Sequence, residues 1–285
     1  MKKKFKGTQI GKRCLSVVSV IGFLSFIVIM DYPFIARLCN ERAQGNVIIA
    51  QERAVKGADK ERIREELQKA AAYNAGLAST GATLADAFQA VESKDKSYDS
   101  LLNLQGDGVM GVIEIPKLLL SLPVYHGTSE QVLQKGAGHL KGSSLPTGGA
   151  DTHTCISAHR GLPDKEMFTN LDQLEEGDCF FIKIMGETLC YRIYQIETVK
   201  PDNTDSLSIV PGKDLATLIT CTPYGLNTHR LYLHGERIPY EDVTENGKEA
   251  GTAGILQMLR KYWWIPVTAL LLVWMVYLLY LINRK

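Results

Sequence analysis

A cysteine, a histidine and an arginine in this sequence each stand at the end of a predicted strand. Strand-forming residues fill positions 216–221, where Cys221 meets a turn-rich segment, and positions 152–159, where His159 precedes a glycine and a proline. An alternating pattern resumes at Arg230, so a hairpin would place Arg230 level with Cys221. Strand ends hold side chains rigidly beside accessible loops, which suits a catalytic site.

These three side-chain types suit acyl transfer through a thioester. An ionised cysteine is a strong nucleophile, and a neighbouring imidazolium or guanidinium favours the thiolate. His159 can protonate an amine leaving group near neutral pH, and Arg230 can donate hydrogen bonds to the oxyanion that forms at the attacked carbonyl. A buried cysteine alone is more often inert packing, so the prediction depends on Cys221, His159 and Arg230 together.

The segments around these residues resemble the signature of the sortase family. Residues 218–221 read Leu-Ile-Thr-Cys with Arg230 after them, and residues 158–161 read Ala-His-Arg-Gly. Further segments resemble class C, the pilin-polymerising sortases; they are residues 103–117, 122–128 and 138–146. The resemblance runs from residue 73 to residue 239, and its motifs follow the order of the family.

Short predicted strands, separated by glycine, proline and asparagine, fill the middle of the chain. They are residues 109–115, 154–157, 180–185, 189–196, 217–221 and 231–233. Short strands without long helices between them favour a closed, antiparallel-rich barrel in a mainly β fold. The resemblance implies the eight-stranded sortase β-barrel over residues 101–240, and the helical patterns at 129–136 and 167–174 are expected to be connectors.

Asp86 and Phe88 lie in a polar loop, residues 81–100, that precedes this barrel. Class C sortases commonly carry a lid here, an Asp-Pro-aromatic triplet over the active site, so the resemblance implies a lid formed by Asp86 and Phe88. Ala87 stands where that triplet has its proline. Alanine leaves the backbone freer than proline does, so we expect a loosely held lid, and an ordinary surface loop is the alternative.

Two apolar stretches flank the predicted domain. The first, within residues 15–36, follows a basic tail of residues 1–14 and is interpreted as a signal anchor; a cleaved signal peptide is the alternative. The second, residues 262–282, is long enough for a transmembrane helix and follows a linker, residues 241–261. The basic tails, including residues 283–285, favour the cytoplasmic side, so the catalytic domain is expected outside the cell membrane.

Residues 37–80 form a predicted extracellular helical segment. Within positions 39–79, apolar residues recur at helical spacing and charged residues occupy the other faces. This pattern predicts an amphipathic helix that packs against the barrel, and a partner-binding helix is the alternative.

Composition argues against several other function classes. The 285 residues carry a formal net charge of +1, which argues against a nucleic-acid partner. Six cysteines without paired CxxC spacing do not indicate a zinc site, and no other metal or cofactor motif is present. Cys179 and Cys190 flank a predicted hairpin, but opposed hairpin positions fit disulfide geometry poorly, so no disulfide is expected between them.

The resemblance implies a membrane-bound cysteine transpeptidase that acts on an LPXTG-type sorting signal of a pilin, between threonine and glycine. Cys221 would attack the threonine carbonyl, Arg230 would stabilise the oxyanion, and His159 would protonate the departing glycine amine. A lysine of another pilin subunit would resolve the thioester, which assembles a covalent pilus. One alternative is a housekeeping sortase that anchors proteins to the cell wall. Another is a papain-like thiol hydrolase, although such enzymes place the cysteine before the histidine and here His159 precedes Cys221. A third is a binding module with an inert cysteine.

Overall fold

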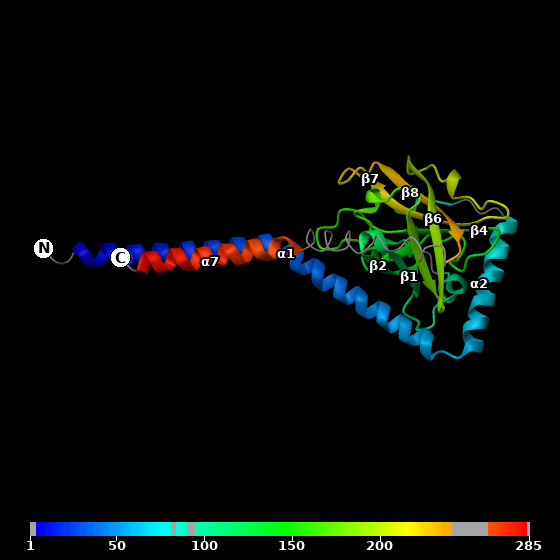
Figure 1. The fold of residues 1–285 in the computed structure, drawn as a ribbon, viewed down its shortest axis with the longest axis horizontal. Coiled ribbons are helices and arrows are strands. Elements are labelled where there is room, and N and C mark those ends of the chain that lie inside the picture. The colour runs from blue at the N-terminus through cyan, green and yellow to red at the C-terminus, as the bar shows by residue number, and fades with distance from the viewer. Residues whose placement is uncertain (1–3, 81–83, 90–94, 241–261, 284–285) are drawn as a thin grey trace.

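The computed structural model of the chain describes residues 4–80, 84–89, 95–240 and 262–283. Figure 1 shows a β-barrel domain flanked by helices, with two helices that extend away from it together. The long helices are α1 (Lys4–Gly57), α2 (Lys60–Thr80) and α7 (Trp264–Asn283).

Eight strands form one closed barrel in the order β1, β2, β3, β4, β7, β8, β6, β5. The strands are β1 (Val109–Ile115), β2 (Leu120–His126), β3 (Ala137–His139), β4 (Thr152–Ser157), β5 (Cys179–Ile184), β6 (Glu187–Val199), β7 (Asp214–Thr222) and β8 (His229–Ile238). β2 pairs with β3 and β4 pairs with β7 in parallel, and the other pairs are antiparallel. The predicted mainly β, closed eight-stranded barrel is confirmed.

Two of the eight strands, β2 and β3, were not among the predicted strands. Pro123 lies inside β2, and proline normally argues against a strand because it donates no ladder hydrogen bond. Here the β2–β3 ladder begins one residue later, where Val124 pairs with Ala137. β3 has only three residues, which is too short for an alternating pattern to be recognised.

The connections between strands contain only single helical turns, at α4 (Glu130–Leu133) and at three 3-10 turns, Pro116–Leu118, Leu171–Gln173 and Asp205–Leu207. Another single turn, α3 (Lys96–Asp99), precedes β1. The two segments expected to be connectors, 129–136 and 167–174, therefore each contain one such turn.

A large cluster of buried apolar side chains forms the core of the barrel domain. Its bulkiest members include Tyr98, Phe168, Phe180 and Tyr191, and the rings of all four are almost completely buried. From α2, the apolar residues that pack against this cluster are Ile63, Leu67 and Tyr73. The helical segment thus packs on the barrel, as its amphipathic pattern predicts.

The helical segment is broken where the pattern over 39–79 predicts one continuous helix. α1 ends at Gly57 and α2 begins at Lys60. Asp59 lies between them, and its side chain accepts a hydrogen bond from the backbone N–H of Glu61 at 3.4 Å. Glycine at a helix end and aspartate before a helix start are ordinary boundary signals, which the apolar periodicity on both sides obscured.

The apolar part of α1, which follows its basic first residues, runs beside α7. Among the described residues, one helix, Val17–Gly57, is long and apolar enough to span a membrane by length and composition. The described apolar stretch of α7, Trp264–Leu278, falls short of that length. Phe34 of α1 stacks on Trp264 with ring centroids 5.3 Å apart, and Figure 1 shows the two helices side by side.

The expected boundaries of the anchor and tails meet the structure only in part. α1 continues through the expected boundary at residue 36 without interruption, although Pro33 lies inside it. The linker, residues 241–261, and the chain ends, residues 1–3 and 284–285, lie outside the described residues. The membrane topology therefore stays a prediction.

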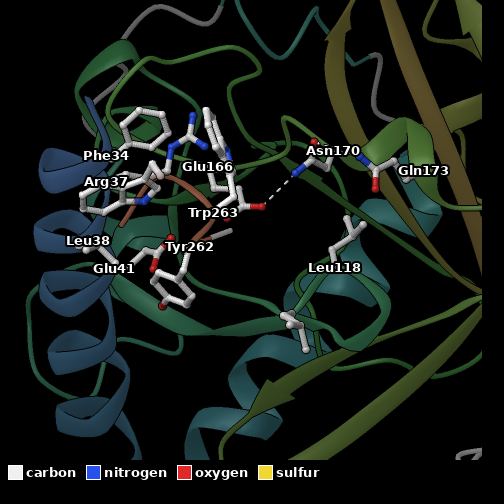
Figure 2. Close-up of a pocket in the computed structure, with 12 residues that line it drawn as sticks. Phe34, Arg37, Leu38, Glu41, Leu118, Glu166, Asn170, Gln173, Tyr262 and Trp263 are labelled. Carbon is white, nitrogen blue, oxygen red and sulfur yellow. Dashed lines mark hydrogen bonds between the residues drawn. The ribbon is translucent and has the colours of Figure 1, made fainter. Parts of the chain in front are cut away.

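A cavity of about 280 Å³ lies where α1 and the start of α7 meet the barrel domain. Figure 2 shows the rings of Phe34, Tyr262 and Trp263 around it, with Arg37 and Glu166 beside them. None of the three predicted catalytic residues lines this cavity, so it is separate from the candidate active site.

Candidate active site

Cys221 and Arg230 lie directly opposite each other on neighbouring strands. β7 and β8 form an antiparallel hairpin whose register pairs Cys221 with Arg230, so the predicted hairpin register is confirmed. Directly paired residues of an antiparallel ladder point to the same side of the sheet. Both residues are nearly buried, with Cys221 7% exposed and Arg230 6% exposed.

The parallel pairing of β4 with β7 brings His159 to the same edge of the barrel. Ser157, the last residue of β4, pairs with Ile219, two residues before Cys221. Beyond the strand, the backbone N–H of Ala158 still donates to the carbonyl of Ile219, at 3.2 Å. His159 follows immediately, so the three predicted catalytic residues occupy the ends of three adjacent strands.

A short segment, residues 84–89, lies over these three residues; we call it the lid segment. The guanidinium of Arg230 donates from Nε to Asp86 Oδ1 at 2.8 Å and from Nη2 to Asp86 Oδ2 at 2.7 Å. The ring centroid of Phe88 lies 5.0 Å from the Arg230 guanidinium carbon and 5.9 Å from the His159 ring. This bidentate ion pair and the cation–π contact hold the lid segment against the site.

The lid segment folds as a tight turn around Ala87. The backbone N–H of Gln89 donates to the carbonyl of Asp86 at 3.1 Å, which makes Ala87 the second residue of a four-residue turn. The N–H of Phe88 also lies 3.4 Å from Asp86 Oδ1. The second turn position favours proline, so the structure explains why an Asp-Pro-aromatic triplet suits this place. The neighbouring positions 81–83 and 90–94 of the predicted loop lie outside the described residues.

Ala87 packs into a second, smaller apolar cluster between the lid segment and the barrel. The buried members of this cluster are Ala87, Leu140, Cys155, Leu207, Ile219 and Tyr232, and Leu84 and Phe88 pack against it. Cys155 and Ile219 alternate with core residues along their strands, so they face the other side of the sheet. The connection between β6 and β7 also contacts the lid segment, because the Thr204 hydroxyl donates to the carbonyl of Leu84 at 3.0 Å.

The Cys221 thiol lies in an environment that raises its pKa. Burial raises its pKa, the charge of Arg230 lowers it, and the charge of Asp86 raises it again, with a net rise above the ordinary value. Low dielectric disfavours the thiolate, while an adjacent cation favours it. With the lid segment in place, Asp86 therefore counteracts the activation that Arg230 gives to the thiol.

Arg230 uses most of its hydrogen-bond donors in this arrangement. Besides the two bonds to Asp86, Nη1 donates to the carbonyls of Asn227 at 3.2 Å and His229 at 3.1 Å. These two backbone bonds orient the guanidinium independently of the lid segment. Removal of Asp86 from the site would leave the N–H groups on Nε and Nη2 free to donate to another anion.

Arg160 forms contacts with two neighbouring segments of this site, which the motif around His159 did not predict. Its Nη1 donates to the Thr222 hydroxyl at 3.2 Å, and its Nη2 forms an ion pair with Asp172. The guanidinium also lies 6.0 Å from the ring centroid of Tyr224. Arg160 thereby links the segment after His159 to the residue that follows Cys221.

Glu130 is a second residue that sequence analysis missed. Its Oε2 lies 3.3 Å from His159 Nε2, and its side chain is 70% exposed. Its Oε1 accepts a hydrogen bond from Gln134 Nε2 at 2.7 Å, one turn later in the chain. No pattern in the sequence links Glu130 to His159, because only the folded barrel brings α4 beside the end of β4.

Four other histidines, at positions 126, 139, 153 and 234, are buried and have hydrogen-bond partners. His139 contacts the Tyr98 hydroxyl at 2.7 Å through Nδ1 and the carbonyl of Ser144 at 2.8 Å through Nε2. Burial lowers the pKa of His139 to about 4 and that of His153 also to about 4. Neutral imidazoles with filled hydrogen-bond positions suit packing. His153 and His234 also lie beside β7, opposite Leu215 and Thr217, but of these three only His159 lies at the strand end that carries Cys221.

The described part of the chain offers no evident site for a metal ion. Within it, no group of three or more His, Cys, Asp or Glu side chains is arranged to hold one. Cys179 and Cys190 are both free thiols. In the register of β5 and β6 they do not lie opposite each other, since Cys179 lies opposite Arg192 and Cys190 lies opposite Phe181.

The chain matches the sortase domain family over residues 113–238. It is similar to the solved structure of sortase C-1 from Actinomyces oris, with 46% identity over 62% of this chain and 99% of that one, and a TM-score of 0.59. It is also similar to sortase C from Streptococcus pneumoniae, with 41% identity over 68% of this chain and 97% of that one, and a TM-score of 0.62.

Among curated proteins, the chain is similar to sortase A of Streptococcus agalactiae, with 30% identity over 150 residues. That match covers 50% of this chain and 60% of the relative. The chain thus aligns with about three fifths of the length of the first curated relatives that it matches.

Proposed function

This chain belongs to the sortase family of cysteine transpeptidases, and on that basis we propose that it joins pilin subunits covalently at an LPXTG-type sorting signal. The solved relative from Streptococcus pneumoniae has been described in terms of catalysis and pilin substrate specificity. Its 41% identity with this chain supports a substrate of the same class. The observation that carries the proposal is the lid segment, in which Asp86 is bound to Arg230 over Cys221.

In the first step, the Cys221 thiolate attacks the threonine carbonyl of the sorting signal. The carbonyl oxygen becomes an oxyanion, which accepts hydrogen bonds from the Nε and Nη2 groups of Arg230 that Asp86 otherwise occupies. The carbon–nitrogen bond to glycine then breaks, and the imidazolium of His159 gives its proton to the leaving amine. The product is a thioester on Cys221 with neutral His159.

In the second step, a lysine amine of another pilin attacks the thioester carbonyl. The carbon–sulfur bond breaks, Cys221 leaves as a thiolate, and His159 takes up a proton from the attacking amine. An isopeptide bond joins the two subunits and the initial ionic state of the enzyme returns. Because the acyl group is held covalently between the steps, the kinetics should be of the ping-pong type.

The proposed location is the cell membrane, with the barrel domain outside and both chain ends in the cytoplasm. The apolar helix from Val17 and the apolar residues of α7 support two membrane contacts. The stacking of Phe34 on Trp264 supports a common exit point for both helices at one end of the barrel domain.

Cell-wall anchoring by a housekeeping sortase is the second candidate function. The 30% identity with sortase A of Streptococcus agalactiae favours it. The higher identity with two sortases C and the lid segment over the site favour pilin polymerisation. The acceptor distinguishes the two functions, since a pilin lysine is required for one and a cell-wall precursor amine for the other.

The test is intact-mass spectrometry of the full chain, and of Cys221→Ala, after incubation with an LPXTG-containing peptide and a lysine-bearing pilin domain. We expect a thioester adduct that depends on Cys221 and a second product in which the peptide is joined to a pilin lysine. Hydrolysis of the peptide without transfer to the pilin would contradict polymerisation. The absence of any adduct, even in an Asp86→Ala and Phe88→Ala double variant, would contradict the transpeptidase mechanism.

A further inference from the structure

The carboxylate of Glu130 stands at the edge of the candidate active site, beside the residue that must handle the proton of the attacking amine. Its Oε2 lies 3.3 Å from His159 Nε2, although the two atoms do not form a well-aligned hydrogen bond. The side chain is 70% exposed, whereas that of His159 is 18% exposed. Glu130 therefore lies between the largely buried imidazole and the surface of the domain.

The position of Glu130 is well defined despite this exposure. It is the first residue of α4, and its backbone carbonyl accepts a hydrogen bond from the N–H of Gln134 at 3.0 Å. Leu133 of the same turn is buried, which anchors α4 to the barrel. The Gln134 side chain occupies Oε1 of Glu130, so Oε2 is the oxygen directed to the site.

Glu130 differs from the other carboxylates around the site in its charge balance. Asp86 is neutralised by Arg230, and Asp172 by Arg160. Across residues 4–80, 84–89, 95–240 and 262–283, no lysine or arginine forms an ion pair with Glu130. Whenever His159 is neutral, as it is after the thioester has formed, Glu130 carries a charge without a partner.

We propose that Glu130 is the subsite for the ε-ammonium group of the acceptor lysine. This inference rests on the proposed function and adds the residue that attracts its second substrate. A lysine side chain is almost entirely cationic near neutral pH, and it must come within hydrogen-bond reach of His159 to react. The uncompensated carboxylate beside that imidazole attracts this cation and disfavours neutral or anionic acceptors.

The proton balance of this step is consistent with the arrangement. The ammonium loses two protons when it becomes the amide nitrogen of the isopeptide bond. His159 takes one of them, which restores the imidazolium beside the Cys221 thiolate. The other proton passes to water at the exposed side of Glu130, where solvent is available.

The test compares two nucleophiles that resolve the same acyl-enzyme. The full chain, held in detergent micelles at low ionic strength, is acylated with an LPXTG-containing peptide and mixed with Nα-acetyl-lysine amide or with hydroxylamine. At about pH 7.5 the lysine compound is cationic and hydroxylamine is neutral. The variants are Glu130→Gln, Glu130→Asp and, as the matched control on an exposed strand end, Glu187→Gln.

In Glu130→Gln we expect the KM for the lysine compound to rise about fivefold, the size of one exposed ion pair, with no rise for hydroxylamine. Glu130→Asp should retain part of the preference for the cation, and Glu187→Gln should behave as the wild type. Glutamine keeps the shape and the contact with Gln134, so loss of the fold does not account for a selective effect.

Two outcomes would overturn the subsite. An equal loss for both nucleophiles would show that Glu130 acts through His159, and no change for either would show that Glu130 has no role in acceptor binding. A wild-type enzyme that transfers to hydroxylamine but to no lysine compound would overturn the proposed function together with the subsite. If the wild type transfers to lysine but Glu130→Gln leaves the ratio of the two KM values, lysine compound to hydroxylamine, unchanged, the subsite alone would be overturned.

Discussion

The two oxygens of Asp86 accept two hydrogen bonds from Arg230, at 2.8 and 2.7 Å, directly above the strand pair that carries Cys221. The pair is almost fully buried, with 7% of the Arg230 side chain and 5% of the Asp86 side chain exposed. The same Asp86 charge raises the pKa of the Cys221 thiol. One contact therefore occupies the proposed oxyanion donors and also disfavours the nucleophilic form of the cysteine.

Asp86→Ala should make Cys221 react about tenfold faster with iodoacetamide at neutral pH. The substitution removes the ion pair that holds the lid segment and also removes a charge that raises the thiol pKa, and each charge-assisted hydrogen bond is worth about 1.5–3 kcal/mol. The rate is followed by intact-mass spectrometry of the full chain. Glu187→Ala, at the start of β6, is the control, and an unchanged labelling rate in Asp86→Ala would contradict the lid interpretation.

Ala87→Pro should slow the same labelling reaction, by about threefold. Ala87 occupies the turn position that favours proline, and a compatible proline stabilises a fixed conformation by about 0.4–1 kcal/mol. The side chain of residue 87 is buried, so an increase in labelling would mean that the ring is too large for the cluster around it. The double variant Asp86→Ala/Ala87→Pro tests this interpretation. The slower labelling caused by the proline should disappear in it, because the lid segment no longer docks without Asp86.

Arg230→Lys should lower the rate of thioester formation about 100-fold, the usual effect of losing one oxyanion donor. Lysine keeps the positive charge but lacks the planar fork that is oriented by the carbonyls of Asn227 and His229. The rate is measured as acyl-enzyme formed with an LPXTG-containing peptide. Arg237→Lys, on the same strand, serves as the matched control, and equal rates in the two variants would argue against a role in oxyanion stabilisation.

Acidification from pH 7.5 to pH 5 should destabilise the barrel, and His139 should account for about 2 kcal/mol of that loss. The pKa of His139 is about 4 in the folded chain, against an ordinary value of 6.5, because burial disfavours the imidazolium. Between these values the unfolded chain binds more protons, so stability is full above pH 6.5 and falls as the pH falls toward 4.

The free energy of unfolding of the full chain, measured in urea at both pH values, tests this assignment. His139→Gln should be less stable at pH 7.5 but should lose less stability on acidification than the wild type. His229→Gln, which removes a partly exposed histidine, is the control. Parallel pH profiles for the wild type and His139→Gln would contradict the assignment to His139.

The pairing of Cys221 with Arg230 could be predicted because it depends on local information. β7 and β8 follow each other along the chain with one turn between them, and a hairpin register is set by the alternation on both sides of its turn. The strand pattern alone predicted only a closed barrel, and the resemblance to a family supplied its eight strands. In β2, Leu120, Leu122 and Val124 alternate, but Pro123 among them argues against a strand, and β3 is only three residues long, too short to show an alternating pattern.

The contacts that complete the site could not be predicted in the same way. Arg230 and Asp86 are separated by 144 positions, and Arg160 and Thr222 by 62. The resemblance to a family indicated that Asp86 lies over the active site, whereas nothing indicated the contact between Arg160 and Thr222. Glu130 lies beside His159 only because the folded barrel places α4 next to the end of β4, which no local pattern encodes.

Asp86 and Phe88 belong to the same chain as the site that they occupy, so every external ligand of that site competes with an internal one. The apparent dissociation constant of such a ligand equals its intrinsic value divided by the fraction of molecules whose site is open. With about one molecule in a hundred open, half occupancy would require about a hundredfold more ligand. A lid segment of this kind would raise the substrate concentration that is needed before Cys221 is acylated.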